Sequence, residues 1–262
     1  HWNILTREVF LSLWIAIFSM LGLYLLGKIK FKLDSEVKHI GFFRFLLAIL
    51  TFAFVLYLIP GLFGAPLKAL SGLVPTEGEN SAFYNRSTAI ISEETNSSKT
   101  TNTAKYADIL HLPFGLKGYF DYDEALAASK LANKPLFIDF VGHSCRECKK
   151  MEGQVLSDPR IIQRLRDNFV VVALYVDEPA KLPEAEQYTS KFDGLRKTSL
   201  GEKNKDIQIA RYGLNGQPYY VIIDQDEKPL VEPKSYDLSI NNFIKFLDSG
   251  KQSYEAKHGP SK

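Results

Sequence analysis

Residues 135–150 read PLFIDFVGHSCRECKK. The apolar run over residues 135–141 predicts a buried strand, and residues 149–165 have the pattern of a helix. Between them stand Cys145 and Cys148, which are the only two cysteines in the 262-residue chain. The stretch is therefore predicted to be a strand that ends in a CxxC motif, and this motif opens a helix.

The position of the cysteine pair indicates dithiol–disulfide chemistry, because a strand, a CxxC motif and a helix form the layout of thioredoxin-like redox sites. Cys145 is expected at the helix N-terminus, where unpaired N–H groups and the helix dipole favour a thiolate. Cys145 is therefore the predicted attacking cysteine. Cys148, one turn inside the helix, is the predicted resolving cysteine.

A CxxC motif also has uses other than redox exchange. A zinc site needs four ligands, and His143 with the two cysteines supplies three, so no metal is predicted. Haem attachment requires a histidine directly after the second cysteine, where Lys149 stands. A purely structural disulfide would close a very small loop, which constrains the unfolded chain least. That last use remains the non-enzymatic alternative.

The apolar residues are unevenly distributed, and nearly all long apolar runs precede Leu73. Residues 9–26 and 45–63 are each about long enough to cross a bilayer, so residues 1–73 are predicted to hold two transmembrane helices. A buried hairpin of a soluble protein is the alternative. The net charge of +2 gives no indication of a nucleic-acid partner.

Basic residues predict the orientation of these two spans. The connection between them carries Lys28, Lys30, Lys32 and Lys38. The positive-inside rule places this connection in the cytoplasm and the CxxC motif on the other side of the membrane. Arg44, just inside the second span, is expected to reach the cytoplasmic interface and has no predicted transport role.

The remainder of the chain is predicted to contain a flexible linker and one α/β domain. Residues 74–117 are the linker, rich in Ser, Thr and Asn. Residues 118–255 form the domain, and residues 256–262 form a tail. The pattern within the domain predicts helices and strands in alternation, with an insertion of unassigned structure at residues 179–213. The predicted helices are residues 121–133, 160–168 and 238–247, and the predicted strands are residues 135–141, 169–176 and 219–223, with residues 228–231 pairing with the last.

Three stretches resemble the DsbD thiol:disulfide interchange family, in its last two membrane helices and its C-terminal thioredoxin-like domain. LYLIPGLFGAPLKALSGLVP (residues 56–75) is similar to that family's final span and its exit. PLFIDFVGHSCRECKKME (135–152) and GLNGQPYYVIID (213–224) are similar to its redox core. The resemblance implies an α/β thioredoxin-like domain tethered to a two-helix transmembrane segment. The Arg-Glu pair between the cysteines departs from the small or neutral pairs of the family, which leaves the redox potential open.

The resemblance also implies a function. Family members take electrons from a cysteine pair in an upstream membrane domain, which is absent from this sequence, and pass them to periplasmic thiol–disulfide proteins. Cytochrome c maturation and disulfide isomerisation are the downstream pathways. The expected protein is a protein-disulfide reductase module in the bacterial inner membrane, with its thioredoxin-like domain in the periplasm and no cofactor besides the Cys145–Cys148 disulfide. An oxidase or isomerase of the same fold is the alternative.

Five further residues receive roles at the site. Asp139 stands where thioredoxin-like proteins keep a buried carboxylate that exchanges a proton with the resolving thiol, although a strand-end Asp that faces water is the alternative. Glu152 lies one turn after Cys148, where the family has an acidic residue. Pro218 is the expected cis-proline, whose preceding residue Gln217 would align a substrate main chain; a trans-proline in a plain turn is the alternative. His143 is expected to tune the thiolate or contact partners, or to be incidental.

Overall fold

The computed structural model describes residues 7–32, 34, 39–63, 65, 67–70, 73–74 and 104–259. The chain divides into two compact units, residues 1–98 and 99–262, which are described separately. Most of the predicted linker (75–103) and residues 260–262 of the predicted tail lie outside the described residues.

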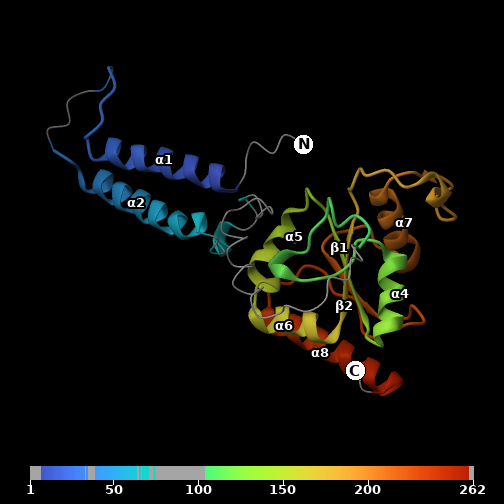
Figure 1. Cartoon of the computed structure of the whole chain (residues 1–262). Helices are drawn as coiled ribbons and strands as arrows, with labels where there is room; N and C mark the ends of the chain where they lie inside the picture. The colour runs from blue at the N-terminus through green and yellow to red at the C-terminus, as the bar shows by residue number, and fades with distance from the viewer. Residues whose placement is uncertain are drawn as a thin grey trace, which may run out of the picture. The chain divides into compact units, whose positions relative to one another are not determined.

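The first unit consists of two helices that lie side by side, α1 (Arg7–Leu25) and α2 (Phe42–Leu62), followed by the short 3-10 turn η1 (Lys68–Leu70) (Figure 1). Both long helices are long and apolar enough to cross a membrane. Many of their large apolar side chains are exposed, such as Phe43 at 79% and Leu56 at 67%. The core helix of a soluble protein would bury such side chains.

Arg44 connects the two long helices. Its Nε donates to the carbonyl of Leu25 at 2.7 Å, and its Nη2 donates to that of Tyr24 at 2.9 Å. These carbonyls lie in the last turn of α1, where carbonyls lack partners within the helix, and that of Tyr24 also accepts from the N–H of Gly27 at 2.9 Å. The guanidinium therefore has a structural role in this unit.

Among the described residues, the second unit contains the following elements in chain order: η2 (Pro113–Gly115), α4 (Tyr122–Ala132), β1 (Leu136–Val141), α5 (Arg146–Met151), the π-helical turn η3 (Glu152–Leu156), α6 (Pro159–Asn168), β2 (Val170–Tyr175), η4 (Glu184–Glu186), β3 (Tyr188–Thr189), β4 (Arg196–Lys197), α7 (Leu200–Tyr212), β5 (Tyr219–Ile223) and α8 (Ile240–His258).

The central sheet has the strand order β2-β1-β5. β1 runs parallel to β2 and antiparallel to β5, with Asp139 opposite both Ala173 and Tyr220. Isolated bridges from Tyr119 to β2 and from Pro229 and Lys234 to β5 widen the sheet at both edges. The parallel pairing of β1 and β2 brings their carboxyl ends to one edge, and the CxxC motif follows at that edge.

Alternate residues of β1 face two different helical layers, as expected for a pleated strand. Leu136, Ile138 and Phe140 pack in a cluster with residues of α4 and α7. Phe137 and Val141 pack in a second cluster with residues of α5, η3, α6 and α8. Figure 1 shows α4 and α7 on one side of the sheet and α5, α6 and α8 on the other. Asp139 lies two residues after Phe137 in the strand and therefore faces the same layer, which carries the cysteines.

The ends of the helices follow from local sequence signals. The Asp121 side chain caps α4 by accepting from the Glu124 N–H. Ser199 and Glu202 form a reciprocal capping box at the start of α7, and Gly213 ends that helix with a φ of +66°.

The structure differs from the sequence prediction at four places. The domain begins before residue 118, because Leu110 and Leu112 are buried in the cluster with α5 and α6. The range 179–213 includes α7, which covers the sheet, so only residues 179–199 lie outside the layers. The last helix continues to His258, into the predicted tail. The predicted helix over residues 149–165 is three segments, α5, η3 and α6.

Candidate active site

Cys145 and Cys148 form a disulfide with an Sγ–Sγ distance of 1.99 Å. Cys145 is the N-cap of α5, and the N–H of Cys148 donates to its Sγ at 3.1 Å. Cys148 is 2% exposed, whereas Cys145 is partly exposed. An incoming thiol or disulfide therefore reaches Cys145 more readily than Cys148. The N–H group beside Cys145 would stabilise its thiolate when the bond is reduced.

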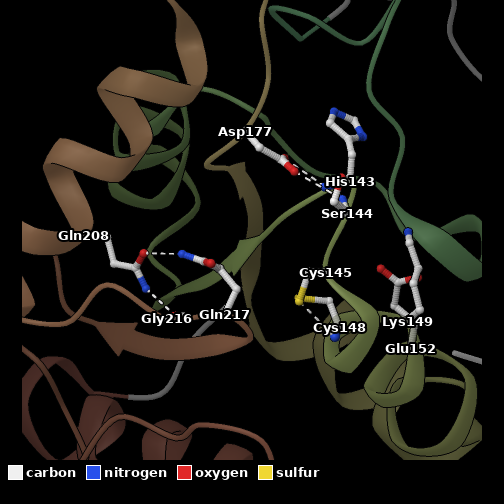
Figure 2. The surroundings of a disulfide bond; sticks show 10 residues. All are labelled: His143, Ser144, Cys145, Cys148, Lys149, Glu152, Asp177, Gln208, Gly216 and Gln217. Carbon is white, nitrogen blue, oxygen red and sulfur yellow. Dashed lines mark hydrogen bonds and ion pairs between the residues drawn. A yellow bond between two sulfur atoms is a disulfide. The ribbon is translucent and has the colours of Figure 1, made fainter. Parts of the chain in front are cut away.

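The loop before Cys145 is held by Asp177, which follows β2. The Asp177 carboxylate accepts from the N–H of His143 at 2.8 Å and from the N–H of Ser144 at 3.1 Å (Figure 2). Each bond is charge-assisted, which makes it stronger than a bond between neutral groups. Asp177 thus fixes the backbone three residues ahead of the CxxC helix.

The neighbouring Glu178 holds the His143 side chain. Its Oε2 lies 2.7 Å from His143 Nε2, and its Oε1 accepts from the Ala180 N–H at 2.9 Å. The imidazole also stacks on the Tyr175 ring at a centroid distance of 4.6 Å. His143 is therefore tied to the β2–α7 loop, although its side chain is still 46% exposed.

Asp139 is a partly buried acid on the face of β1 that is directed to the CxxC helix. Its Oδ1 is inaccessible to solvent and has no hydrogen-bond partner among the described residues. The pKa of Asp139 is raised to about 8: burial of the carboxyl group raises it most, the charge of Glu152 adds to the rise, and Lys149 opposes it. A carboxyl with this pKa is mostly protonated at neutral pH but retains a minor ionised fraction, and its pKa lies close to that of an ordinary thiol, about 8.5.

Glu152 is buried, and burial raises its pKa, while Lys149 lowers it. Lys149 Nζ lies 3.4 Å from Glu152 Oε2, and the lysine is only partly exposed. The side chain is directed to the buried carboxylates and moderates the rise in their pKa values.

The Gln217–Pro218 peptide bond is cis, as predicted. Tyr219 pairs with Phe140 in the sheet, so Pro218 lies next to Val141, at the point where β1 leads into the CxxC loop. The Gln217 side chain is directed away from the disulfide, and its Nε2 donates to Gln208 Oε1 at 2.8 Å (Figure 2). The part of Gln217 that remains to meet a substrate is its main chain.

The predicted site residues thus lie in two groups on the disulfide's side of the sheet. Asp139 and Glu152 interact electrostatically beneath α5, while Pro218 adjoins the CxxC loop through the β1–β5 pairing. Sequence reasoning missed Asp177 and Glu178. Their position directly after an apolar strand parallel to β1 was a usable signal, because residues at adjacent parallel strand ends meet. It also missed Gln208, for which the sequence contains no comparable signal.

No cluster of three or more His, Cys, Asp or Glu side chains arranged to bind a metal occurs within the part of the chain that the structure describes. The arrangement that is present combines a partly exposed sulfur, a buried sulfur and a buried acid. Such a set can carry out thiol–disulfide exchange with proton transfer.

Residues 122–251 match the family model of a thioredoxin-like domain. Among characterised proteins, the thioredoxin-related protein DsbJ of Chlamydia pneumoniae is 26% identical over 119 residues, which are 45% of this chain and 30% of that protein. The chain thus matches under a third of that relative's length.

Solved structures with a similar fold include the DsbH oxidoreductase, with 21% identity and a TM-score of 0.40 over 60% of this chain and 95% of that one. They also include the oxidised C-terminal domain of Neisseria meningitidis DsbD, with 18% identity and a TM-score of 0.36 over 51% of this chain and 99% of that one. The chain therefore carries a thioredoxin-like α/β domain, with relatives among the Dsb proteins, after two apolar helices.

Proposed function

We propose that this protein is a membrane-anchored thiol–disulfide oxidoreductase that works as a protein-disulfide reductase. The observation that carries the proposal is the Cys145–Cys148 disulfide, with its partly exposed first sulfur and its buried second sulfur, at the start of α5 in a thioredoxin-like domain. Asp139 supports the proposal, because a carboxyl with a pKa of about 8 can hold and release a proton near neutral pH, and the nearby Glu152 contributes to raising that pKa.

The proposed reaction consists of two exchange steps. In the reduced protein, the Cys145 thiolate attacks a disulfide of the partner, and one partner sulfur leaves as a thiolate. The resulting mixed disulfide joins Cys145 to the second partner sulfur. The Cys148 thiolate then attacks Cys145, which forms the Cys145–Cys148 disulfide and releases the second partner sulfur as a thiolate. Two electrons pass to the partner, and each departing thiolate takes up a proton.

Asp139 is the proposed proton acceptor for Cys148. A buried thiol is a weak nucleophile until it loses its proton, and a neighbouring ionised carboxylate can accept that proton directly or through a water molecule. The raised pKa of Asp139, at about 8, keeps proton transfer to and from a thiol nearly balanced. Glu152 would keep that pKa high through its charge, and Lys149 would limit the effect.

We further propose that the two helices anchor the domain in the bacterial inner membrane and that the domain lies in the periplasm. The lysines between the helices support this orientation. The electron donor would be a cysteine pair in an upstream membrane domain, and the acceptors would be periplasmic thiol–disulfide proteins of cytochrome c maturation or disulfide isomerisation. The DsbD resemblance in residues 56–75, 135–152 and 213–224 supports this pathway.

The reduction potential of Cys145–Cys148 tests the direction of the reaction. The full chain in nanodiscs would be equilibrated with thiol buffers and then alkylated; because it has only two cysteines, the readout is unambiguous. A potential near that of thioredoxin, about −270 mV, is expected for a reductase. A value near about −120 mV, as in strong oxidants, would contradict the proposal and favour disulfide formation. Unfolding of the domain upon reduction would instead favour a structural disulfide.

A further inference from the structure

Gln208, in the middle of α7, binds the segment that precedes the cis-proline. Its Nε2 donates to the Gly216 carbonyl at 2.8 Å, and its Oε1 accepts from Gln217 Nε2 at 2.8 Å (Figure 2). The side chain is fully buried. Both polar atoms of its amide are therefore engaged by the two residues directly before Pro218.

Few other hydrogen bonds hold this segment. Within the described residues, the main chain of residues 214–218 forms no backbone-to-backbone hydrogen bond outside the strand pairing. Residues 213–215 are exposed, and the space around a Cβ at Gly216 is empty. The position of the segment is thus set mainly by the strand that follows it and by Gln208.

The other end of α7 is fixed to the loop that holds the CxxC motif. The N–H of Leu200 donates to the Ala180 carbonyl at 2.8 Å, and the N–H of Gly201 donates to the Glu178 carbonyl at 2.9 Å. A Cβ at Gly201 would lie 2.6 Å from the Glu178 nitrogen, so the helix can approach this closely only with glycine there. Since Glu178 also binds His143, α7 is connected to both sides of the disulfide.

We propose that Gln208 is a positioning residue that holds residues 216–218 in register with the disulfide and keeps the Gln217 side chain out of the substrate path. The substrate then meets only the main chain of Gln217. This arrangement fits extended polypeptide segments on either side of a disulfide, with little selection among their side chains. The inference rests on the proposed function, because it concerns how the same site binds its protein substrate.

The test compares two disulfide substrates in the full chain in nanodiscs. One is a peptide with an intramolecular disulfide. This peptide is long enough to lie along residues 216–218 of the protein while its disulfide meets Cys145. The other is hydroxyethyl disulfide, which is too small to reach them. In Gln208→Leu, KM for the peptide is expected to rise about tenfold, which corresponds to about 1.4 kcal/mol of lost alignment. The rate with hydroxyethyl disulfide and the equilibrium constant with glutathione are expected to change less than twofold.

Two further variants keep the test decisive. Gln208→Glu retains the acceptor for Gln217 but places an oxygen opposite the Gly216 carbonyl, so it is expected to raise the KM for the peptide. This variant serves as the test if Gln208→Leu does not fold. Asp206→Asn is the matched control, because Asp206 is also buried on α7 but binds Tyr188 and Ser190 in the β3–β4 turn. It is expected to leave the peptide KM unchanged.

An unchanged peptide KM in folded Gln208 variants would overturn this inference but not the proposed function. Equal losses of activity with the peptide and with hydroxyethyl disulfide would have the same meaning. A wild-type protein that is inactive towards both disulfides would overturn the proposed function, and the inference with it.

Discussion

Asp139→Asn is expected to flatten the pH dependence of stability. The pKa of Asp139 is about 8 in the folded protein, against about 3.9 for an Asp in an unfolded chain. Between these two values the folded protein retains a proton that the unfolded chain has released. The free energy of unfolding therefore falls as the pH rises through this window, and the stabilisation is complete only below pH about 4.

The size of the effect follows from linkage. A single proton retained only by the folded state changes the free energy of unfolding by about 1.4 kcal/mol per pH unit. Between pH 5 and pH 7, Asp139 alone therefore contributes a decrease of at most about 2.7 kcal/mol. Asn cannot ionise, so the variant loses this slope. The side-chain amide of the variant occupies a site where Oδ1 has no hydrogen-bond partner. An unsatisfied polar group of this kind lowers the free energy of unfolding by about 1–3 kcal/mol at every pH.

Urea unfolding of the oxidised chain in detergent micelles, at pH 5, 6 and 7, measures the slope through the near-ultraviolet signal of the tyrosines. Some slope should remain in the variant, because the raised pKa of Glu152 acts with the same sign. Asp237→Asn is the control of opposite sign, since hydrogen bonds lower the pKa of Asp237 to about 2. That variant should alter the slope only below pH about 4. Parallel curves for wild type and Asp139→Asn would refute the burial of an acid at this position.

Three further variants test the surroundings of the site. Lys149→Met is expected to raise the pKa of Asp139 further, because the ammonium lowers it, and the carboxyl stretching band in infrared spectra against pH measures this change. Asp177→Ala should release two N–H groups in the CxxC loop, lower stability by about 1–2 kcal/mol and speed amide exchange there. Lys203→Met should destabilise the domain by about 3–5 kcal/mol in urea unfolding, because it leaves the buried Asp121 carboxylate without its cation.

Each of these variants has an outcome that would contradict its premise. A lower carboxyl pKa in Lys149→Met would mean that the ammonium is directed elsewhere. Unchanged amide exchange in Asp177→Ala would exclude a positioning role for that carboxylate. Lys105→Met is the control for Lys203→Met, because it removes a more exposed ion pair, with Glu186, and should change stability by less than about 1 kcal/mol. Equal losses of stability in Lys105→Met and Lys203→Met would refute the dependence on burial.

The sequence was sufficient to predict the elements whose signals are local. The apolar runs predicted β1 and β2 to within one residue at each end, and residues 219–223 form β5 as predicted. The cis bond before Pro218 was also predicted correctly. In each case the signal lies in the segment itself, as an apolar run or a proline that opens a strand.

Features that depend on contacts between distant segments were not predictable in this way. Residues 200–212 have no clear apolar face, because α7 buries Lys203, Asn204 and Gln208 and compensates them with partners far along the chain. Periodicity therefore gave no reason to assign a helix that covers the sheet. The burial of Leu110 and Leu112 depends in the same way on a core formed later in the chain.

Trapping of the mixed disulfide tests the central claim most directly. Reduced Cys148→Ser, mixed with a peptide disulfide, is predicted to accumulate a covalent adduct at Cys145 that mass spectrometry can locate, because no resolving thiol remains to release it. Reduced Cys145→Ser is predicted to form its adduct far more slowly, since Cys148 is only 2% exposed. Equal adduct formation at both cysteines, or none at Cys145, would contradict the assignment of Cys145 as the attacking residue.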